Sequence, residues 1–107
     1  MDKEMVLFPS ESQFNEKTDE LMVDECYWTI PTYPKNKENL IGSKIYFYDK
    51  ALNRICLRST VTKFEDVEGK KAVFFDMGED DWEYGIDLEE KGIPRRTQSR
   101  GWAYRWW

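Results

Sequence analysis

Three β-rich runs follow one another between residues 40 and 75, and they constrain the fold of this chain more than any other feature. The first run, residues 44–48, alternates apolar residues with tyrosines, which is the period of two that a pleated strand imposes on its side chains. The third run, residues 71–75, is apolar on both faces and predicts an interior strand. The rest of the chain therefore has to pack against these strands.

The second run, residues 54–64, is also predicted to alternate. Its apolar side would carry Ile55, Leu57 and Val61, and its polar side Arg58, Thr60 and Thr62. A hairpin loop is predicted over residues 49–53, because its first and last residues, Asp and Asn, tolerate turn conformations and bond to nearby backbone. The dipeptide Glu-Gly at positions 68 and 69 predicts the next turn.

The chain before these runs predicts two more strands and a helix. The apolar residues 5–8 are long enough for one strand, which the following proline ends. Residues 11–22 have the spacing of an amphipathic helix, preceded by a capping box. Residues 26–30 predict a second, aromatic strand, and residues 34–39 a polar loop.

After the third run, the sequence predicts an acidic loop, a short element and a last strand. Residues 84–88 fit either a short strand or a helical turn. Residues 102–107 predict the last strand, with Trp102, Tyr104 and Trp106 on one face. About six strands with one N-terminal helix define an α+β, mainly β fold, and such a sheet usually removes its edges by curling into a small barrel.

Length and composition narrow the class of protein. The 107 residues fit a single domain. No apolar run approaches the roughly 18 residues of a membrane span, and the first residues lack the order of a signal peptide, so we expect a cytoplasmic protein. Cys26 and Cys56 lie far apart, which favours free thiols over a disulfide. The absence of histidine excludes a histidine base and makes a zinc site unfavourable.

The net charge of −5 is unevenly distributed. Residues 1–93 carry 21 acids and 12 bases, a balance of −9, whereas residues 94–107 carry four arginines and no acid. An acidic body argues against broad binding to a phosphate backbone, but a basic segment still allows one local anionic site.

The C-terminal segment, residues 95–107, interleaves arginines with aromatic residues. Guanidinium groups pair with phosphate oxygens and aromatic rings stack on bases, so this pattern fits a nucleotide or single-strand site. The same pattern also fits a closing strand whose tryptophans complete the core and whose arginines pair with the acidic body. Alternate residues of one strand point to opposite faces, so both descriptions can hold together.

Residues 5–64 resemble the PUA-like superfamily of small pseudo-barrels, which includes the ASCH and EVE domains. The likeness lies in a strand ending in proline, a helix, an aromatic strand and then Gly-Ser-Lys-Ile-Tyr-Phe-Tyr at residues 42–48, leading into a hairpin. The resemblance implies a PUA-like pseudo-barrel. It also implies an aromatic pocket for a modified or flipped base, with Trp28 and Tyr33 as candidates, although Trp28 fits a core position as well.

One departure concerns catalysis. ASCH domains resemble one another in a Gly-x-Lys-x-x-Glu-x-Arg stretch, and the matching residues 22–28 offer only Glu25, without the lysine or the arginine. The chain also has no nucleophile with a base and no phosphate-binding glycine loop, so a binding module is favoured over an enzyme. The acids of residues 79–83 fit a solvated loop better than a cation site.

We therefore predict a module that binds RNA or a modified nucleotide through a cleft of aromatic and arginine side chains, without a cofactor or a metal. The predicted contacts are Trp28, Tyr33, Arg58, Arg95, Arg96, Arg100 and Trp102. Arg58 lies on the polar side of its strand, with Arg54, where surface ion pairs explain both equally well. The alternative is an acidic protein-binding or inhibitory module that mimics nucleic acid.

Overall fold

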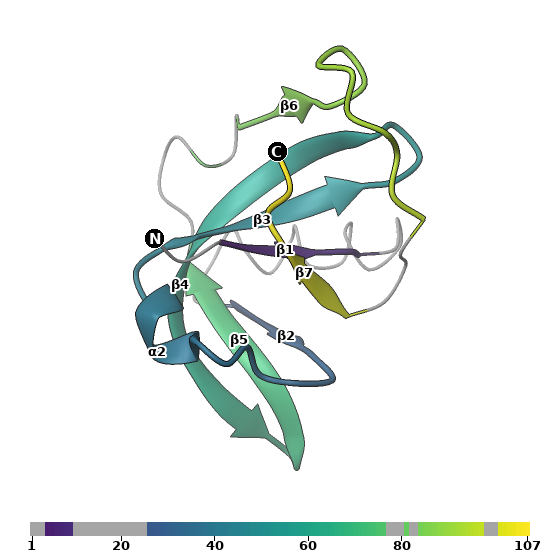
Figure 1. The fold of residues 1–107 in the computed structure, drawn as a ribbon. Coiled ribbons are helices and arrows are strands. Elements are labelled where there is room, and N and C mark those ends of the chain that lie inside the picture. The colour runs from purple at the N-terminus through teal and green to yellow at the C-terminus, as the bar shows by residue number, and fades with distance from the viewer. Residues whose placement is uncertain (1–3, 10–25, 77–80, 82–83, 98–100) are drawn as a thin grey trace.

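The computed structural model describes residues 4–9, 26–76, 81, 84–97 and 101–107, which contain seven strands of one sheet and one short helix (Figure 1). The elements are β1 (Met5–Leu7), β2 (Cys26–Thr29), α2 (Lys37–Leu40), β3 (Lys44–Asp49), β4 (Arg54–Val67), β5 (Lys70–Asp76), β6 (Ile86–Asp87) and β7 (Trp102–Tyr104). The helix predicted over residues 11–22 lies outside the described residues. Residues 84–88, which fit a strand or a helical turn, contain the short strand β6.

The strands run in the order β2-β5-β4-β3-β1-β7, and β6 pairs with β4 beside this path. The β1–β3 pair is parallel and the other pairs are antiparallel. The interior position predicted for residues 71–75 is confirmed, because β5 lies between β2 and β4. The end strands β2 and β7 do not pair with each other in the described residues, so the sheet is open and a closed barrel is not confirmed.

Two hydrophobic cores lie on opposite faces of the central strands. The first core contains Met5, Leu7, Cys26, Ile30, Leu40, Ile45, Phe47, Leu57, Val61, Val73 and Phe75. The second core contains Val6, Phe8, Tyr46, Tyr48, Ile55 and Leu88. Because β1 and β3 send alternate side chains into each core, the alternation predicted for residues 44–48 is confirmed.

A β-bulge changes the side on which one predicted core residue lies. Phe47 pairs with Leu57, but the next residue, Tyr48, pairs with Ile55, so Cys56 is an extra residue in β4. Ile55 consequently packs in the second core, while Leu57 packs in the first. The prediction that Ile55 shares a face with Leu57 and Val61 is therefore wrong.

Residues 34–39 are not entirely a loop, as the sequence predicted. The N–H of Leu40 donates to the carbonyl of Asn36 at 3.2 Å, which forms the single turn of α2. One turn makes too few hydrogen bonds to stabilise itself. Its position is set by Leu40, which is buried in the first core.

The last predicted strand ends early. β7 stops at Tyr104, Trp102 packs against the first core, and Trp106 packs against the second. The prediction that Trp102, Tyr104 and Trp106 share one face is therefore wrong. Arg105 still donates its N–H to the carbonyl of Glu4 at 2.8 Å, and beyond it both terminal tryptophans pack against the second core.

Side chains link the two ends of the open sheet. Trp102 on β7 donates Nε1–H to the carbonyl of Thr32, just after β2, at 2.9 Å. Tyr104 donates its hydroxyl to Asn36 Oδ1 at 2.7 Å. Gly101 has a φ of +74°, and a Cβ at this position would lie 3.4 Å from the Pro31 ring, so a larger residue would be strained there. The segment after β2 is thereby held against β7.

Cys26 and Cys56 are not joined by a disulfide, as predicted. Burial, followed by the nearby Asp49 charge, raises the pKa of the Cys56 thiol to about 11. In the part of the chain that the structure describes, no helix is long and apolar enough to cross a membrane.

Candidate nucleic-acid interface

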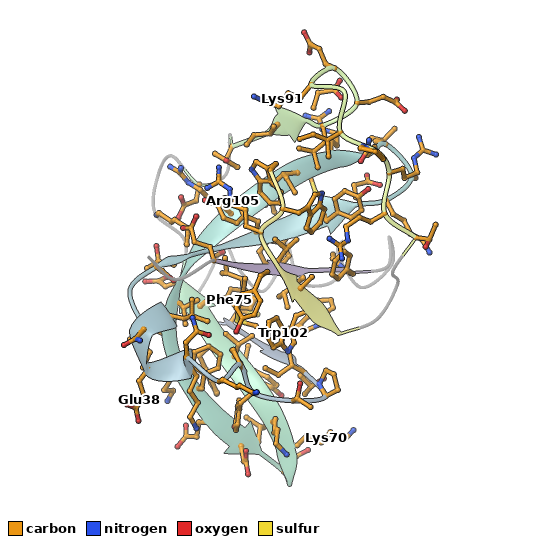
Figure 2. The ribbon with its side chains drawn as sticks, viewed as in Figure 1. Glu38, Lys70, Phe75, Lys91, Trp102 and Arg105 are labelled. Carbon is orange, nitrogen blue, oxygen red and sulfur yellow. The ribbon has the colours of Figure 1, made fainter. Side chains whose placement is uncertain are left out.

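Three of the predicted aromatic contacts lie against the first core. Trp28 on β2, Tyr33 in the following segment and Trp102 on β7 are each partly buried and packed on that cluster. They reach it from two strands at opposite ends of the sheet order, and Figure 2 labels Trp102 close to Phe75 of the core. The packing gives all three residues a structural role, and their partial burial leaves some ring surface accessible.

The ring of Tyr33 lies among charged side chains at the β4–β5 hairpin. Its edge packs on Phe64, with 5.9 Å between ring centroids, and its hydroxyl donates to Asp66. Lys37 Nζ lies 4.4 Å from the ring centroid and Lys71 Nζ lies 5.9 Å from it, a cation–π arrangement. Loss of hydration, and next the bond to Asp66, raises the pKa of Tyr33, so the phenol stays protonated at neutral pH.

A groove lies beside this cluster, where β2 ends and the β4–β5 turn begins. Its volume is about 340 Å³, and its lining comprises Thr29, Ile30, Pro31, Gly69, Lys70 and Lys71. Glu68 and Gly69 have φ values of 51° and 80°, as a tight hairpin turn requires. Two adjacent lysines of β5 are among the lining residues, and Figure 2 shows Lys70 at the tip of the hairpin.

Arg58 is held by an ion pair, which was one of its two predicted roles. Its Nε donates to Asp81 Oδ1 at 2.7 Å, and Lys44 Nζ lies 3.3 Å from the same oxygen. The guanidinium also covers the ring of Tyr84 at 4.6 Å. The hydrogen bond to Asp81 is the main cause that raises the pKa of Arg58. Asp81 is only 2% exposed, so the solvated loop predicted for residues 79–83 is wrong for this residue.

The described arginines of the C-terminal segment lie against the second core or at the surface. The Arg96 guanidinium covers the Trp106 ring at 4.4 Å, and its backbone N–H donates to the Tyr48 hydroxyl at 3.0 Å. Arg95 Nη2 lies 3.6 Å from Glu89 Oε1, an exposed pair of small energetic value. Arg100 lies outside the described residues. The second core thus accounts for the position of Arg96 without a ligand.

Arg105 belongs to a network that the sequence did not indicate. Its Nη1 donates to Glu4 Oε1 at 2.9 Å and to the Tyr46 hydroxyl at 3.2 Å. Tyr46 itself donates to Glu4 Oε1 at 3.0 Å. Burial, and next the bond to Glu4, raises the pKa of Tyr46, which therefore remains a neutral donor. Glu4 and Arg105 are almost a chain length apart in sequence, so no local pattern reveals the pair.

The predicted contacts therefore form two groups on opposite faces of the sheet. Trp28, Tyr33 and Trp102 adjoin the first core. Arg58 and Arg96 cover Tyr84 and Trp106, which pack on the second core. Sequence reasoning missed Lys70 and Lys71; the signal was their position directly after the predicted turn.

The described residues contain no candidate metal site, because no three acidic, cysteine or histidine side chains among them lie close enough together to bind one ion. The chemical groups at the groove are instead ammonium groups, a hydroxyl and ring surfaces. Such groups bind anions and planar rings.

In comparisons with known proteins, no protein-family model matches this chain, and neither the curated proteins nor the solved structures gave a significant match.

Proposed function

We propose that this chain is a PUA-like, cytoplasmic module that binds nucleic acid, either single-stranded RNA or a modified nucleotide, at the groove beside β2. The observation that carries the proposal is the pairing of Lys70 and Lys71 with a groove of about 340 Å³, next to the ring of Tyr33. This volume lies at the lower end of the range for small-molecule sites. Lysine ammonium groups are common ligands for phosphate.

The distribution of paired and unpaired cations supports the groove over the C-terminal segment. Arg58 and Arg105 form ion pairs with Asp81 and Glu4. Lys70 and Lys71 have no carboxylate within ion-pair distance among the described residues. A cation without a protein partner has the larger electrostatic gain from a phosphate, because no existing pair has to break.

The bridge between the sheet ends supports the PUA-like part of the proposal. Trp102 and Tyr104 bond to the segment after β2, so side chains join the ends of a sheet whose strands do not close it. A pseudo-barrel is a sheet curled until its ends approach, and these two bonds are compatible with that geometry.

A fluorescence titration tests the proposal. Short single-stranded RNA is added at low salt, where phosphate contacts are strongest, while tryptophan emission is followed. Lys70→Glu/Lys71→Glu should weaken binding at least tenfold and lower the slope of log affinity against log salt by about 1.4, or 0.7 for each lost phosphate contact.

The matched control is Lys50→Glu/Lys91→Glu, which makes the same charge change at exposed lysines outside the groove; Lys91 lies at the opposite end of the molecule (Figure 2). It should bind RNA within about threefold of the parent, the size of a long-range charge effect. Equal losses in the two variants would show nonspecific electrostatics, and no binding by the parent at low salt would refute the proposal.

The second candidate is an acidic module that binds a basic groove on a partner protein. It is favoured by two ion pairs within the chain, Arg95 with Glu89 and Arg105 with Glu4. These pairs occupy two of the C-terminal arginines, and the acidic residues of the rest of the chain still outnumber its basic residues. A pull-down with and without nuclease separates the candidates. A partner retained after nuclease treatment supports direct protein contact, and one released by nuclease supports nucleic-acid binding.

A further inference from the structure

Lysine, arginine and threonine side chains gather on the face of β3 and β4 that carries the second core. Lys44 and Thr60 pair across the β3–β4 ladder, and so do Tyr46 and Arg58, two residues away on each strand. Side chains two residues apart point to the same face of a strand, and Tyr46 belongs to the second core. Lys44, Arg58 and Thr60 therefore lie on one face, on strands that run side by side in Figure 1.

Two of these side chains form ion pairs with one buried oxygen. Lys44 Nζ lies 3.3 Å from Asp81 Oδ1, and Arg58 Nε lies 2.7 Å from the same atom. Lys44 Nζ also donates to the Thr60 hydroxyl at 2.9 Å. Nitrogens that share one acceptor lie close together, so the ammonium group, the guanidinium group and the hydroxyl are all within reach of a single phosphate group.

The two cations are more exposed than the carboxylate that they share. The side chains of Lys44 and Arg58 are 36% and 27% exposed, whereas the side chain of Asp81 is 3% exposed. Two cations and one carboxylate also give this group of three a net positive charge. The buried carboxylate thus orients both cations from the protein interior, and the excess positive charge lies on the side that solvent reaches.

The ion pairs leave hydrogen-bond donors available. Arg58 uses Nε for Asp81, and among the described residues no hydrogen bond involves its two Nη groups. The guanidinium lies over the Tyr84 ring at 4.6 Å, which restricts its orientation. Lys44 has a third N–H, and the Thr60 hydroxyl, which accepts from Lys44, can still donate its proton. An oxyanion can therefore bind here without breaking an existing pair.

We propose that Lys44, Arg58 and Thr60 bind one phosphate group, either free phosphate or the phosphate of a small phosphomonoester. The site shares no residue with the groove and does not rest on RNA binding. A guanidinium binds phosphate oxygens through two parallel N–H groups, and the remaining oxygens can accept from the ammonium group and the hydroxyl. Arg58, which the sequence predicted as a ligand contact, has its phosphate-binding role at this second site.

An NMR titration with inorganic phosphate, followed at the amide resonances of β3 and β4 and matched with chloride of equal ionic strength, tests the proposal. The parent should bind phosphate with a dissociation constant on the order of 1 mM, because so small a ligand makes few contacts. Binding should also raise the melting temperature above that in chloride. A purely structural role of the ion pairs predicts neither effect, and the absence of both would overturn the proposal.

Two variants test the donors, and thermal melting checks that each is folded. Arg58→Gln should weaken phosphate binding about 10- to 100-fold, because it removes charge-assisted bonds. Thr60→Val keeps both ion pairs and the shape of the side chain, and it should weaken binding about 2- to 10-fold. Binding as tight as in the parent, in either variant, would overturn the site.

The matched control is Arg96→Gln, which removes an arginine that also covers an aromatic ring but lies outside the site. It should bind phosphate within about threefold of the parent, the size of a long-range charge effect. Equal losses in Arg58→Gln and Arg96→Gln would show a nonspecific charge effect and would also overturn the site.

Two further measurements identify the source of the phosphate and separate this site from the groove. Glycerol phosphate that binds as tightly as inorganic phosphate would assign the site to phosphomonoesters, and about tenfold weaker binding would assign it to free phosphate. Lys70→Glu/Lys71→Glu should bind phosphate within about threefold of the parent, since neither lysine belongs to the site. A parent that binds phosphate but no RNA would refute the proposed function alone, and the reverse result would refute this site alone.

Discussion

The centre of the sheet and its β4–β5 hairpin differ in how many faces are covered. At β1 and β3, alternate side chains enter two cores, so that Ile45, Tyr46, Phe47 and Tyr48 are all buried. On β2, beside the hairpin, Cys26 packs in the first core, whereas the next residue, Tyr27, is 37% exposed. The central strands β1 and β3 therefore stabilise the fold, whereas the β4–β5 hairpin and the neighbouring β2 keep aromatic and lysine side chains accessible.

The largest expected effect is a direct test of this contrast. Phe47→Ala removes a ring that is 1% exposed and packs edge-on against Phe75, and it should lower the free energy of unfolding by about 3–5 kcal/mol. Phe74→Ala, at a half-buried position, should cost about 1–2 kcal/mol, because part of its surface is already hydrated. Urea unfolding measures both values, and equal losses would contradict the contrast.

A smaller loss of stability is expected when the buried carboxylate of Asp81 is removed, since it forms ion pairs with Lys44 and Arg58. Asp81→Asn leaves Lys44 and Arg58 without their common anionic partner, and it should lower the free energy of unfolding by about 1–3 kcal/mol. The range is modest because the two cations remain partly hydrated. Asp66→Asn, an equivalent change on the hairpin, should cost below about 0.5 kcal/mol. Thermal or urea unfolding of both variants checks the difference.

The smallest effect concerns Cys56, the extra residue of the bulge between the two cores, and it appears only at high pH. Its pKa of about 11 lies above the ordinary value of 9.0, so the folded thiol keeps its proton after the unfolded thiol has lost it. The stabilisation is complete below pH 9 and is lost as the pH rises towards 11, by at most about 2 kcal/mol. The difference in stability between the parent and Cys56→Ala, followed by urea unfolding from pH 8 to 11, should therefore shrink. A difference independent of pH would contradict the burial of this thiol.

The sequence predicted local features well because they depend on near neighbours. The alternation of residues 44–48, the interior position of β5 and the turn at Gly69 all follow from residues within a few positions of one another. The side of Ile55 could not be predicted, since one extra residue in β4 reverses the alternation and leaves no signature in the local pattern.

The candidate site was less predictable than the fold. Trp28, Tyr33 and Trp102 were predicted as contacts and adjoin one core, but Arg58 and Arg96, which were expected beside them, pack elsewhere. The position of the Arg105 side chain depends on its bond to Glu4, which lies 101 residues away in the sequence. The position of the Arg58 side chain depends on its bond to Asp81, in another segment. The groove arises where β2 meets the β4–β5 turn, a neighbourhood that only the tertiary fold creates.

The place of β1 in the sheet sets an order of events during folding. β1 lies between β3 and β7, so the earliest described strand completes its pairing with the last one. The β3–β4 and β4–β5 hairpins need only local loop closure and can form while the chain is still being made, whereas the β1–β7 ladder spans nearly the whole sequence. On the ribosome, β1 therefore lacks its partner on one edge until residues 102–104 emerge, and an unpaired strand edge is a site where other chains can pair.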